Sequence, residues 1–372
     1  MIITSLRIRN FRNLTSVDLE LSPGINLFFG RNAQGKTAIL EAVAYLATST
    51  SHRAGKDEEM IRWEQPAAFV SGQVQTEVEE LTLEFGLSFQ GKQVKVGGQV
   101  LKRIRDLYGL LRVVLFVPED LEIIGGGPSE RRRFLDLMIS QLEPDHITRL
   151  QRYQQVIRSR NQLLKQAEKR RLDPVEIETW DVQLIETAIP VIETRMRAIV
   201  QLTGVLEEFG KKITSGRETL RARYQLSVQP AEGQTLQTAF EERLVASRLN
   251  DIKQGATSFG PHRDDIQFIL NGKDLRKFGS QGQRRTAALA LRLAEFHWLR
   301  ENTDSQPVML LDDVIYEMDE GRRNLFFEQI GQAGQVLITA TEPEHLAPLV
   351  PRSRLFRVDQ GRVQDSSDDA AV

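Results

Sequence analysis

The chain has 372 residues, 40% of them hydrophobic and 27% charged, which is enough to bury at least one sizeable core. The 49 lysines and arginines nearly balance the 51 aspartates and glutamates, so any nucleic-acid surface must be a local patch rather than a whole-molecule field. The absence of cysteine excludes disulfides and cysteine-based metal or thiol chemistry.

The N-terminal residues, 1–8, alternate apolar and polar side chains, which is typical of a strand and unlike a signal peptide. No apolar run in the chain approaches the roughly 18 residues that a membrane span needs. We therefore expect a cytoplasmic protein with no membrane partner.

Residues 30–37 fit the phosphate-binding loop (P-loop) pattern G-x-x-x-x-G-K-[ST]. Strand patterns at 19–21 and 25–29 precede this loop and a helix pattern at 38–46 follows it, which disfavours the alternative of a glycine-rich surface turn. Lys36 would reach the β- and γ-phosphates of ATP, and the Thr37 hydroxyl would hold Mg²⁺. The expected nucleotide contacts are Gly30, Arg31, Asn32, Ala33, Gln34, Gly35, Lys36 and Thr37.

The strand and helix patterns predict one α/β unit that is split by a helical insertion. Residues 1–117 are rich in short strands and should form the N-terminal part of an ATPase head, with an antiparallel sheet. Residues 118–256 should form a mainly helical lobe, and strand signals return in 257–364, the C-terminal part of the head. The acidic residues 365–372 are expected to be a disordered tail.

An apolar strand at 308–311 ends in two carboxylates, Asp312 and Asp313. In a P-loop enzyme this is the Walker B position, where Asp312 would join the Mg²⁺ shell and Asp313 would orient or deprotonate the attacking water. A strand that simply runs into a polar loop is the alternative. The P-loop upstream favours the catalytic interpretation.

Residues 278–283 precede a predicted helix at about 283–300 and could form an anion site like the signature loop of ABC-type ATPases. Ser280, Gly282 and Gln283 would then contact the γ-phosphate held by a partner subunit. The alternative is that Ser280 is only a helix N-cap. Asp319 falls where a loop crosses the dimer interface in ABC ATPases, and Thr341 would be a polar γ-phosphate sensor in place of the transporter-type histidine.

The motifs together resemble the RecF family, bacterial recombination mediators related to SMC-type ATPases. The stretches that carry the resemblance are spread over most of the chain, and 131–136 (Arg-Arg-Arg-Phe-Leu-Asp) and 260–265 (Gly-Pro-His-Arg-Asp-Asp) are the most specific. The others are residues 6–13, 30–37, 118–121, 127–130, 280–284 and 310–319. Departures are mild: Ala38, Gly279 and Tyr316 stand where Asn, Ala and Ser are common.

The resemblance implies an α/β fold with an ABC-type P-loop ATPase head, made of a mixed sheet and an antiparallel β-subdomain, and an inserted helical lobe. It also implies ATP and Mg²⁺ as cofactors, an ATP-dependent homodimer, and slow, DNA-stimulated ATP hydrolysis. DNA binding near single-strand gaps, action with RecO and RecR to load RecA, and roles in replication and SOS induction would follow. Arg12 would lie close to the bound nucleotide.

The helical region carries a basic cluster with few acids, which could contact several DNA phosphates without reading sequence. The candidate DNA-binding residues are Arg158, Arg160, Lys169 and Arg170. A solvated helix face is the alternative. Similarly, Arg131, Arg132 and Arg133 begin a helix, where positive charge is disfavoured, which indicates either an anionic partner or a solvated basic face.

Two other functions remain open from the residues. One is the ATPase subunit of a membrane transporter, which the helical insertion and the missing switch histidine disfavour. The other is an architectural adaptor with a structural nucleotide, which Asp313 disfavours. The five histidines are too scattered to predict a metal site.

Overall fold

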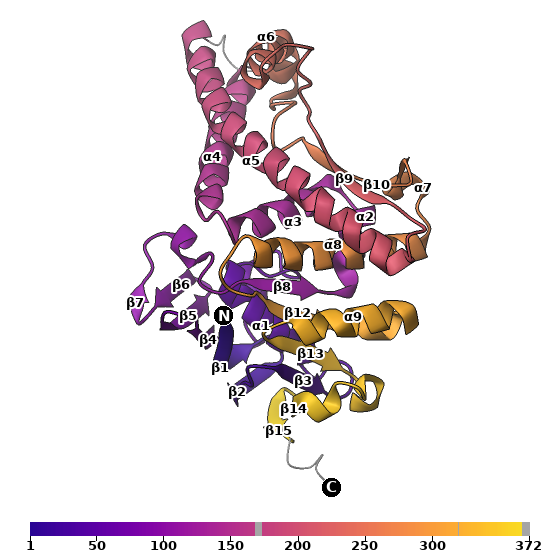
Figure 1. The fold of residues 1–372 in the computed structure, drawn as a ribbon. Coiled ribbons are helices and arrows are strands. Elements are labelled where there is room, and N and C mark those ends of the chain that lie inside the picture. Colours follow the sequence, from indigo (N-terminus) through magenta and orange to yellow (C-terminus); the bar gives the residue numbers. More distant parts are fainter. Residues whose placement is uncertain (168–172, 319, 367–372) are drawn as a thin grey trace. The chain divides into compact units, whose positions relative to one another are not determined.

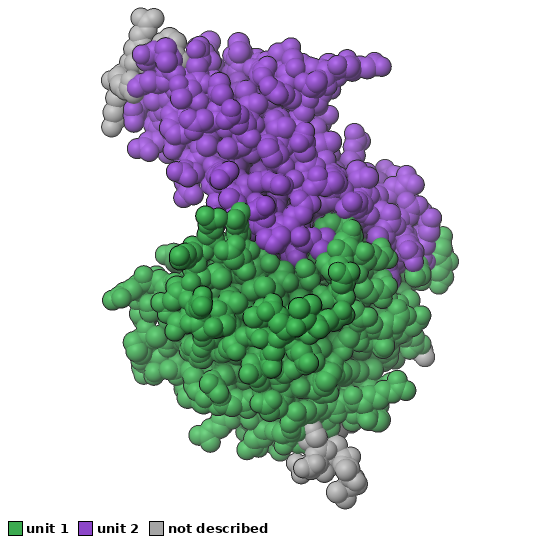
Figure 2. All heavy atoms as spheres, turned by 60° about the vertical axis from the view of Figure 1, so that its left-hand side comes forward, with its two compact units in different colours: residues 1–120, 212–216, 288–372 green, residues 121–211, 217–287 purple. Residues whose placement is uncertain are grey.

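The computed structural model describes residues 1–167, 173–318 and 320–366, which form two compact units. Unit 1 comprises residues 1–120, 212–216 and 288–372, and unit 2 comprises 121–211 and 217–287; Figure 2 colours them green and purple. The sequence prediction assigned 257–287 to the ATPase head, whereas these residues cluster with unit 2. None of the described helices combines the length and the apolar character that crossing a bilayer requires.

Unit 1 contains a mixed sheet in the order β15-β14-β3-β13-β12-β8 (Figure 1). Its central strands are parallel and mostly apolar, as expected for strands buried on both faces. Every residue of β12 and β13 is buried. The strands are β3 (Ile25–Phe29), β8 (Val113–Phe116), β12 (Val308–Asp312), β13 (Val336–Ala340), β14 (Ser353–Asp359) and β15 (Arg362–Asp365).

A second, antiparallel sheet in unit 1 has the order β2-β1-β4-β5-β6-β7. Helix α1 (Lys36–Thr48) contributes buried side chains to a core shared with both sheets, and Thr37 is its one residue that is not buried. This arrangement fixes the start of α1 next to the ends of the parallel strands. The strands are β1 (Ile2–Phe11), β2 (Leu14–Glu20), β4 (Ala67–Gln75), β5 (Glu80–Ser88), β6 (Gly91–Val96) and β7 (Gln99–Val100).

Unit 2 is mainly helical, with a core supplied by α4, α5 and α6. Its three-stranded sheet has the order β11-β10-β9, and the pairing of β10 with β9 holds the segment after residue 257 in this unit. Strand β9 was not among the predicted elements, although its Leu220 and Ala222 are buried in alternation with exposed arginines. The elements are α2 (Leu121–Gly125), α3 (Pro128–Ser140), α4 (Asp145–Gln166), α5 (Pro174–Thr214), β9 (Leu220–Gln225), α6 (Leu236–Gln254), β10 (Asp265–Leu270), β11 (Lys273–Asp274) and α7 (Leu275–Phe278).

Two further helices follow along the chain. Helix α8 (Gln281–Glu301) begins among the residues of unit 2 and ends among those of unit 1, and α9 (Glu320–Gln332) lies between β12 and β13 in the sequence. Short 3₁₀ helices complete the described elements: η1 (Asp57–Met60), η2 (Ile104–Leu107), η3 (Pro118–Asp120), η4 (Val314–Glu317), η5 (Pro343–Leu346) and η6 (Val350–Arg352).

Candidate functional site

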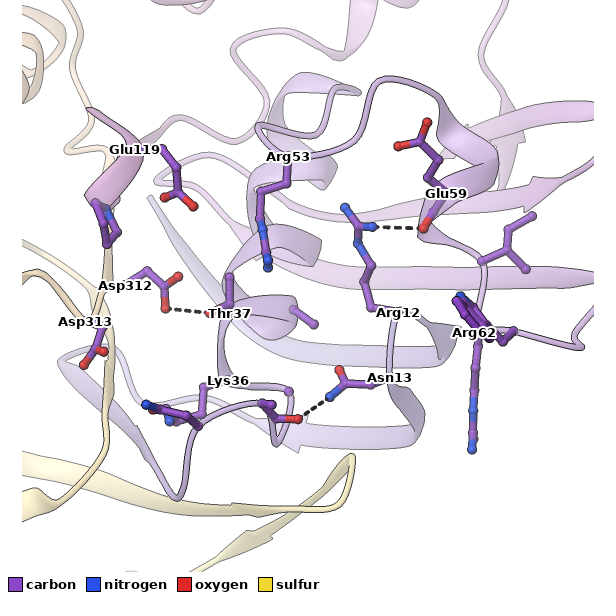
Figure 3. A pocket seen from close by; sticks show the side chains of 17 residues that line it. Arg12, Asn13, Lys36, Thr37, Arg53, Glu59, Arg62, Glu119, Asp312 and Asp313 are labelled. Carbon is purple, nitrogen blue, oxygen red and sulfur yellow. Dashed lines mark hydrogen bonds between the residues drawn. The ribbon is translucent and has the colours of Figure 1, made fainter. Parts of the chain in front are cut away.

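The candidate site is a cavity of about 1060 Å³ in unit 1, a volume that suits a nucleotide-sized ligand. Figure 3 shows Asp312 and Asp313 at one end, Lys36 and Thr37 beside them, and Arg12 and Arg62 at the other end. Its lining residues are Arg12, Asn13, Asn32, Ala33, Gly35, Lys36, Thr37, Ala38, Arg53, Glu59, Ile61, Arg62, Trp63, Pro118, Glu119, Asp312 and Asp313. Five of the eight predicted P-loop residues therefore share one cavity with Asp312 and Asp313, whereas Gly30, Arg31 and Gln34 are not among its lining residues.

The P-loop backbone requires both of its glycines. Gly30 has φ +149°, and a Cβ there would lie 2.2 Å from the Val358 carbonyl oxygen. Gly35 has φ +117°, and a Cβ there would lie 2.6 Å from Leu14 Cδ2. A side chain at Gly30 would clash with the β14 backbone, and a side chain at either position would be strained at these dihedral angles, so both positions favour glycine.

Lys36 turns back over the loop that it follows. Its ammonium donates to the carbonyl oxygens of Gly30 at 2.6 Å and of Arg31 at 3.0 Å. Burial lowers the pKa of Lys36, and the nearby carboxylates of Asp313 and Asp312 partly offset this effect. A partly desolvated cation held among backbone dipoles is well suited to bind a strongly charged anion such as a phosphate.

Thr37 and Asp312 meet although 275 positions separate them in the chain. The Thr37 hydroxyl donates to Asp312 Oδ1 at 3.0 Å, and the Thr339 hydroxyl donates to the same oxygen at 2.7 Å. Burial raises the pKa of the Asp312 carboxyl, and the neighbouring charge of Asp313 adds to that effect. A bound cation would favour the ionised form that burial disfavours.

The oxygens of Thr37 and Asp312 fit Mg²⁺. Two neighbouring ligands of an octahedral Mg²⁺, with bonds of about 2.1 Å, lie about 3.0 Å apart, which matches the separation of these two oxygens. Within the described residues, no three histidine, aspartate or glutamate side chains form a metal cluster.

Asp313 follows in an unusual backbone conformation. Its φ of +54° is left-handed, and its backbone N–H donates to the Thr339 hydroxyl at 3.0 Å. A non-glycine residue at positive φ is uncommon, and such strain often occurs at functional sites. The turn directs the chain so that Asp313 lines the cavity beside Asp312.

Arg12 lines the cavity and is held there by a buried carboxylate. Its guanidinium donates twice to Glu41, at 2.6 and 2.9 Å, and once to the Glu59 carbonyl oxygen at 2.9 Å. Although burial opposes ionisation, hydrogen bonds from Arg12 and Ser51 hold the pKa of Glu41 below its usual value. Arg12 therefore lines the cavity with its charge paired to Glu41.

The signature-loop residues lie in unit 2. The Gln283 N–H donates to Ser280 Oγ at 3.2 Å, and the Ser280 N–H donates to Gln283 Oε1 at 3.1 Å, which makes a reciprocal cap of helix α8. Within the chain, Ser280 therefore acts as the N-cap of helix α8. Ser280 and Gly282 are exposed, and a Cβ at Gly282 would meet nothing within 4 Å.

Two other predicted residues, the γ-phosphate sensor Thr341 and the interface residue Asp319, are not seen in the cavity. Thr341 follows β13 and is half-buried, and it is not among the residues that line the cavity. Asp319 lies outside the described residues.

Sequence reasoning missed several lining residues between α1 and β4 and at the start of η3. Arg53, Arg62 and Trp63 stand on no motif and follow no periodicity, and Glu119 was given no role although it lies in the stretch 118–121, so only the fold brings these residues to the P-loop. Asn13 was missed as well, and its side-chain amide donates to the Ala33 carbonyl oxygen at 3.0 Å. The one available signal in the sequence was a tryptophan set among polar residues at 62–65.

The structure corrects the DNA-binding prediction for Arg160. This side chain is 0% exposed, and it donates to Asp181 at 2.8 Å and to Asp251 at 3.1 Å, so it cannot reach a DNA phosphate. Arg158 is exposed on α4, whereas Lys169 and Arg170 lie outside the described residues. The basic run therefore contains a buried structural arginine as well as surface charge.

The two most specific family stretches meet inside unit 2. Arg131 is buried and donates to both carboxylate oxygens of Asp265, at 2.7 and 2.9 Å. Arg132 donates to the Asp264 carbonyl oxygen at 2.8 Å. The predicted anionic partner of Arg131 is thus a carboxylate of the same chain.

The chain is similar to known proteins over nearly its whole length. Residues 2–364 match the family model described as the RecF/RecN/SMC N terminal domain. A protein of Halalkalibacterium halodurans named DNA replication and repair protein RecF is 37% identical over 369 residues, covering 98% of the chain and 99% of the relative. One of the same name from Listeria monocytogenes is 36% identical over 370 residues, covering 98% and 100%.

Solved structures similar to this chain include members of the same family as the relatives found by sequence. The recombination mediator protein RecF with ATP, described in the RecFOR pathway, superposes with a TM-score of 0.90 at 33% identity, covering 98% of the chain and 97% of that structure. An SMC head bound to the C-winged helix domain of ScpA has a TM-score of 0.58 at 14% identity and full coverage of both chains, which bears on the fold alone. The predicted fold class, α/β with an ABC-type ATPase head, is confirmed.

Proposed function

The chain belongs to the RecF family, and from that premise we propose that it is an ATP-switched, DNA-binding protein of recombinational repair. The observation that carries the proposal is the contact of Thr37 with Asp312 at 3.0 Å, because it joins the P-loop to the Walker B strand in one cavity. A relative of 33% identity was solved with ATP, which supports ATP as the ligand.

Each residue of the site would have a defined task. The P-loop amides and Lys36 would bind the phosphates, with the lysine exchanging its two carbonyl contacts for phosphate oxygens. Thr37 and Asp312 would hold Mg²⁺, which when bound neutralises the charge on the β- and γ-phosphates. Asp313, at the same end of the cavity, would orient the attacking water. We propose that ATP hydrolysis at this site is slow.

ATP would act mainly by favouring a closed homodimer. Ser280, Gly282 and Gln283 are proposed to complete the site of a partner subunit, with Thr341 sensing the γ-phosphate. The exposure of Ser280 and Gly282 supports this role, since a capped helix start leaves its N-terminal dipole facing outward. ATP then shifts the population because it binds the closed state better.

A signature-loop variant tests the composite site. Ser280→Arg should abolish ATP-dependent dimerisation, measured by light scattering, and leave ATP binding to the monomer within about twofold. The control is Ser280→Thr, which keeps the capping hydroxyl. If Ser280→Arg still dimerises normally with ATP, the trans-acting signature loop is wrong.

DNA is proposed to bind the protein without sequence readout, at gaps or duplex junctions, with Arg158 as one described contact. Action with RecO and RecR to load RecA, and roles in replication and SOS induction, complete the proposal; the RecFOR pathway named for the solved relative supports these partners. Arg158→Ala should reduce the slope of log affinity against log salt by about one phosphate contact. An unchanged slope would remove Arg158 from the surface.

ATP turnover per subunit, measured against protein concentration with and without a gapped duplex, tests the whole proposal. Turnover that rises with concentration and with DNA would support a composite site and a DNA role together. Turnover that depends on neither would favour a self-contained site, as in the transporter-like or adaptor alternatives. Membership in the RecF family and the cavity position of Asp313 count against both alternatives.

A further inference from the structure

The two ends of the cavity carry opposite charges. Figure 3 shows the carboxylates Asp312 and Asp313 at one end and Arg62 at the other, with the P-loop lysine next to the carboxylates. A nucleotide whose terminal phosphate meets Lys36 and Thr37 therefore extends its remaining parts toward Arg62. The residue after Arg62 is Trp63, which also lines the cavity.

Trp63 is unusual among the tryptophans of this chain. It is 92% exposed, whereas Trp298 is 5% exposed and Trp180 is half-buried in the helical unit. A large apolar ring left in water at the mouth of a ligand cavity loses the burial that normally stabilises it. Such a ring gains that contact when a flat, aromatic ligand lies on it.

The backbone presents Trp63 from a fixed position. The Arg62 N–H donates to the Asn10 carbonyl oxygen at 2.8 Å, and the Gln65 N–H closes a turn onto the Arg62 carbonyl oxygen at 3.1 Å. Glu64 completes the turn with φ +62°. The turn is attached to the end of β1, next to the strand-to-loop segment whose Asn13 bonds to the P-loop. Trp63 is thus positioned relative to the phosphate site by ordered backbone rather than by a free loop.

We propose that Trp63 is the stacking platform for the purine base of the bound nucleotide. This inference rests on the proposed ATP binding and names the part of the site that recognises the base. Phosphates have no aromatic face, so the platform contributes nothing to binding of a triphosphate without a base. Stacking on an aromatic side chain is tolerant of base identity, so the platform adds affinity for the base without selecting among bases.

The platform is tested by comparing ATP with inorganic tripolyphosphate in calorimetric titrations. Trp63→Ala should weaken ATP binding about 5- to 100-fold, the usual range for base stacking on an aromatic side chain, and leave tripolyphosphate binding within about twofold. Trp63→Phe should retain part of the ATP affinity. Phe89→Ala is the matched control, because Phe89 is an exposed aromatic residue (65%) in unit 1 that does not line the cavity.

A fluorescence measurement reports the same contact directly. Acrylamide quenching of Trp63, taken as wild type minus Trp63→Phe, should decrease when ATP is added and stay unchanged with tripolyphosphate. Equal weakening of both ligands in Trp63→Ala, or unaltered ATP affinity with no protection from quenching, would overturn the platform while leaving ATP binding intact. Failure of the wild type to bind either ligand would overturn the proposed function and this inference with it.

Discussion

Replacing the buried Arg160 should destabilise unit 2 severely. The guanidinium donates to Asp181 at 2.8 Å, to Asp251 at 3.1 Å and to the Thr257 hydroxyl at 2.8 Å. Arg160→Ala removes the cation and leaves Asp251, 0% exposed, without its arginine, while Asp181 keeps Arg248. Breaking a buried pair by removing one partner costs about 3–5 kcal/mol, because an uncompensated charge stays in the interior.

Urea unfolding followed by circular dichroism at 222 nm measures this cost. A loss of about 3–5 kcal/mol corresponds to a midpoint that falls by about 1–5 M urea. Arg158→Ala, on the exposed face of the same helix, is the control and should change stability by less than about 0.5 kcal/mol. If Arg160→Ala keeps the wild-type midpoint and loses DNA affinity, the assignment of Arg160 to the interior is wrong.

Three further changes test the site and its surroundings. Asp313→Asn, in which asparagine tolerates φ +54°, should lower ATP turnover by about 10²–10⁴-fold with little change in ATP affinity; unaltered turnover would exclude Asp313 as the residue that activates water. Gly30→Ala places a Cβ 2.2 Å from the Val358 carbonyl oxygen, so calorimetry should show loss of ATP binding, and retained affinity would contradict the glycine requirement. Burial lowers the pKa of His262 to about 4 from an unfolded value of about 6.5, so its contribution to stability is present above pH 6.5 and is lost as the pH falls toward 4. His262→Gln should therefore weaken the dependence of the urea midpoint on pH between pH 6.5 and 4. The pKa of His52 is also lowered to about 4, so part of this dependence should remain. A pH dependence identical to that of the wild type would contradict the contribution assigned to His262.

The parts of the site that the sequence predicted are those where a short stretch determines the backbone. The P-loop needs two glycines at fixed spacing and a lysine at the start of a helix, and these residues are adjacent in the chain. The strand before Asp312 is an uninterrupted apolar run, as a strand buried on both faces must be. Local pattern therefore indicated the phosphate loop, the carboxylates and the α/β class.

The domain boundary was harder to predict because it depends on pairing between distant strands. The arginine-rich strand β9 looked like part of a helical lobe, whereas its pairing with β10, together with contacts such as that of Arg131 with Asp265, holds the segment after residue 257 in unit 2. Alternation in six residues is too short a signal to identify the partner strand.

By itself, the sequence determined that a phosphate loop and an acidic strand end exist in this chain, because backbone geometry and hydropathy over a few residues are local properties. Only the tertiary structure decided that Arg160 is buried against Asp251, that Asp312 accepts a hydrogen bond from Thr37, and that Trp63 lines the same cavity. Each of these depends on residues far apart in the chain that packing brings together. The sequence shows which side chains are charged or aromatic, but the fold determines their solvent exposure and their partners.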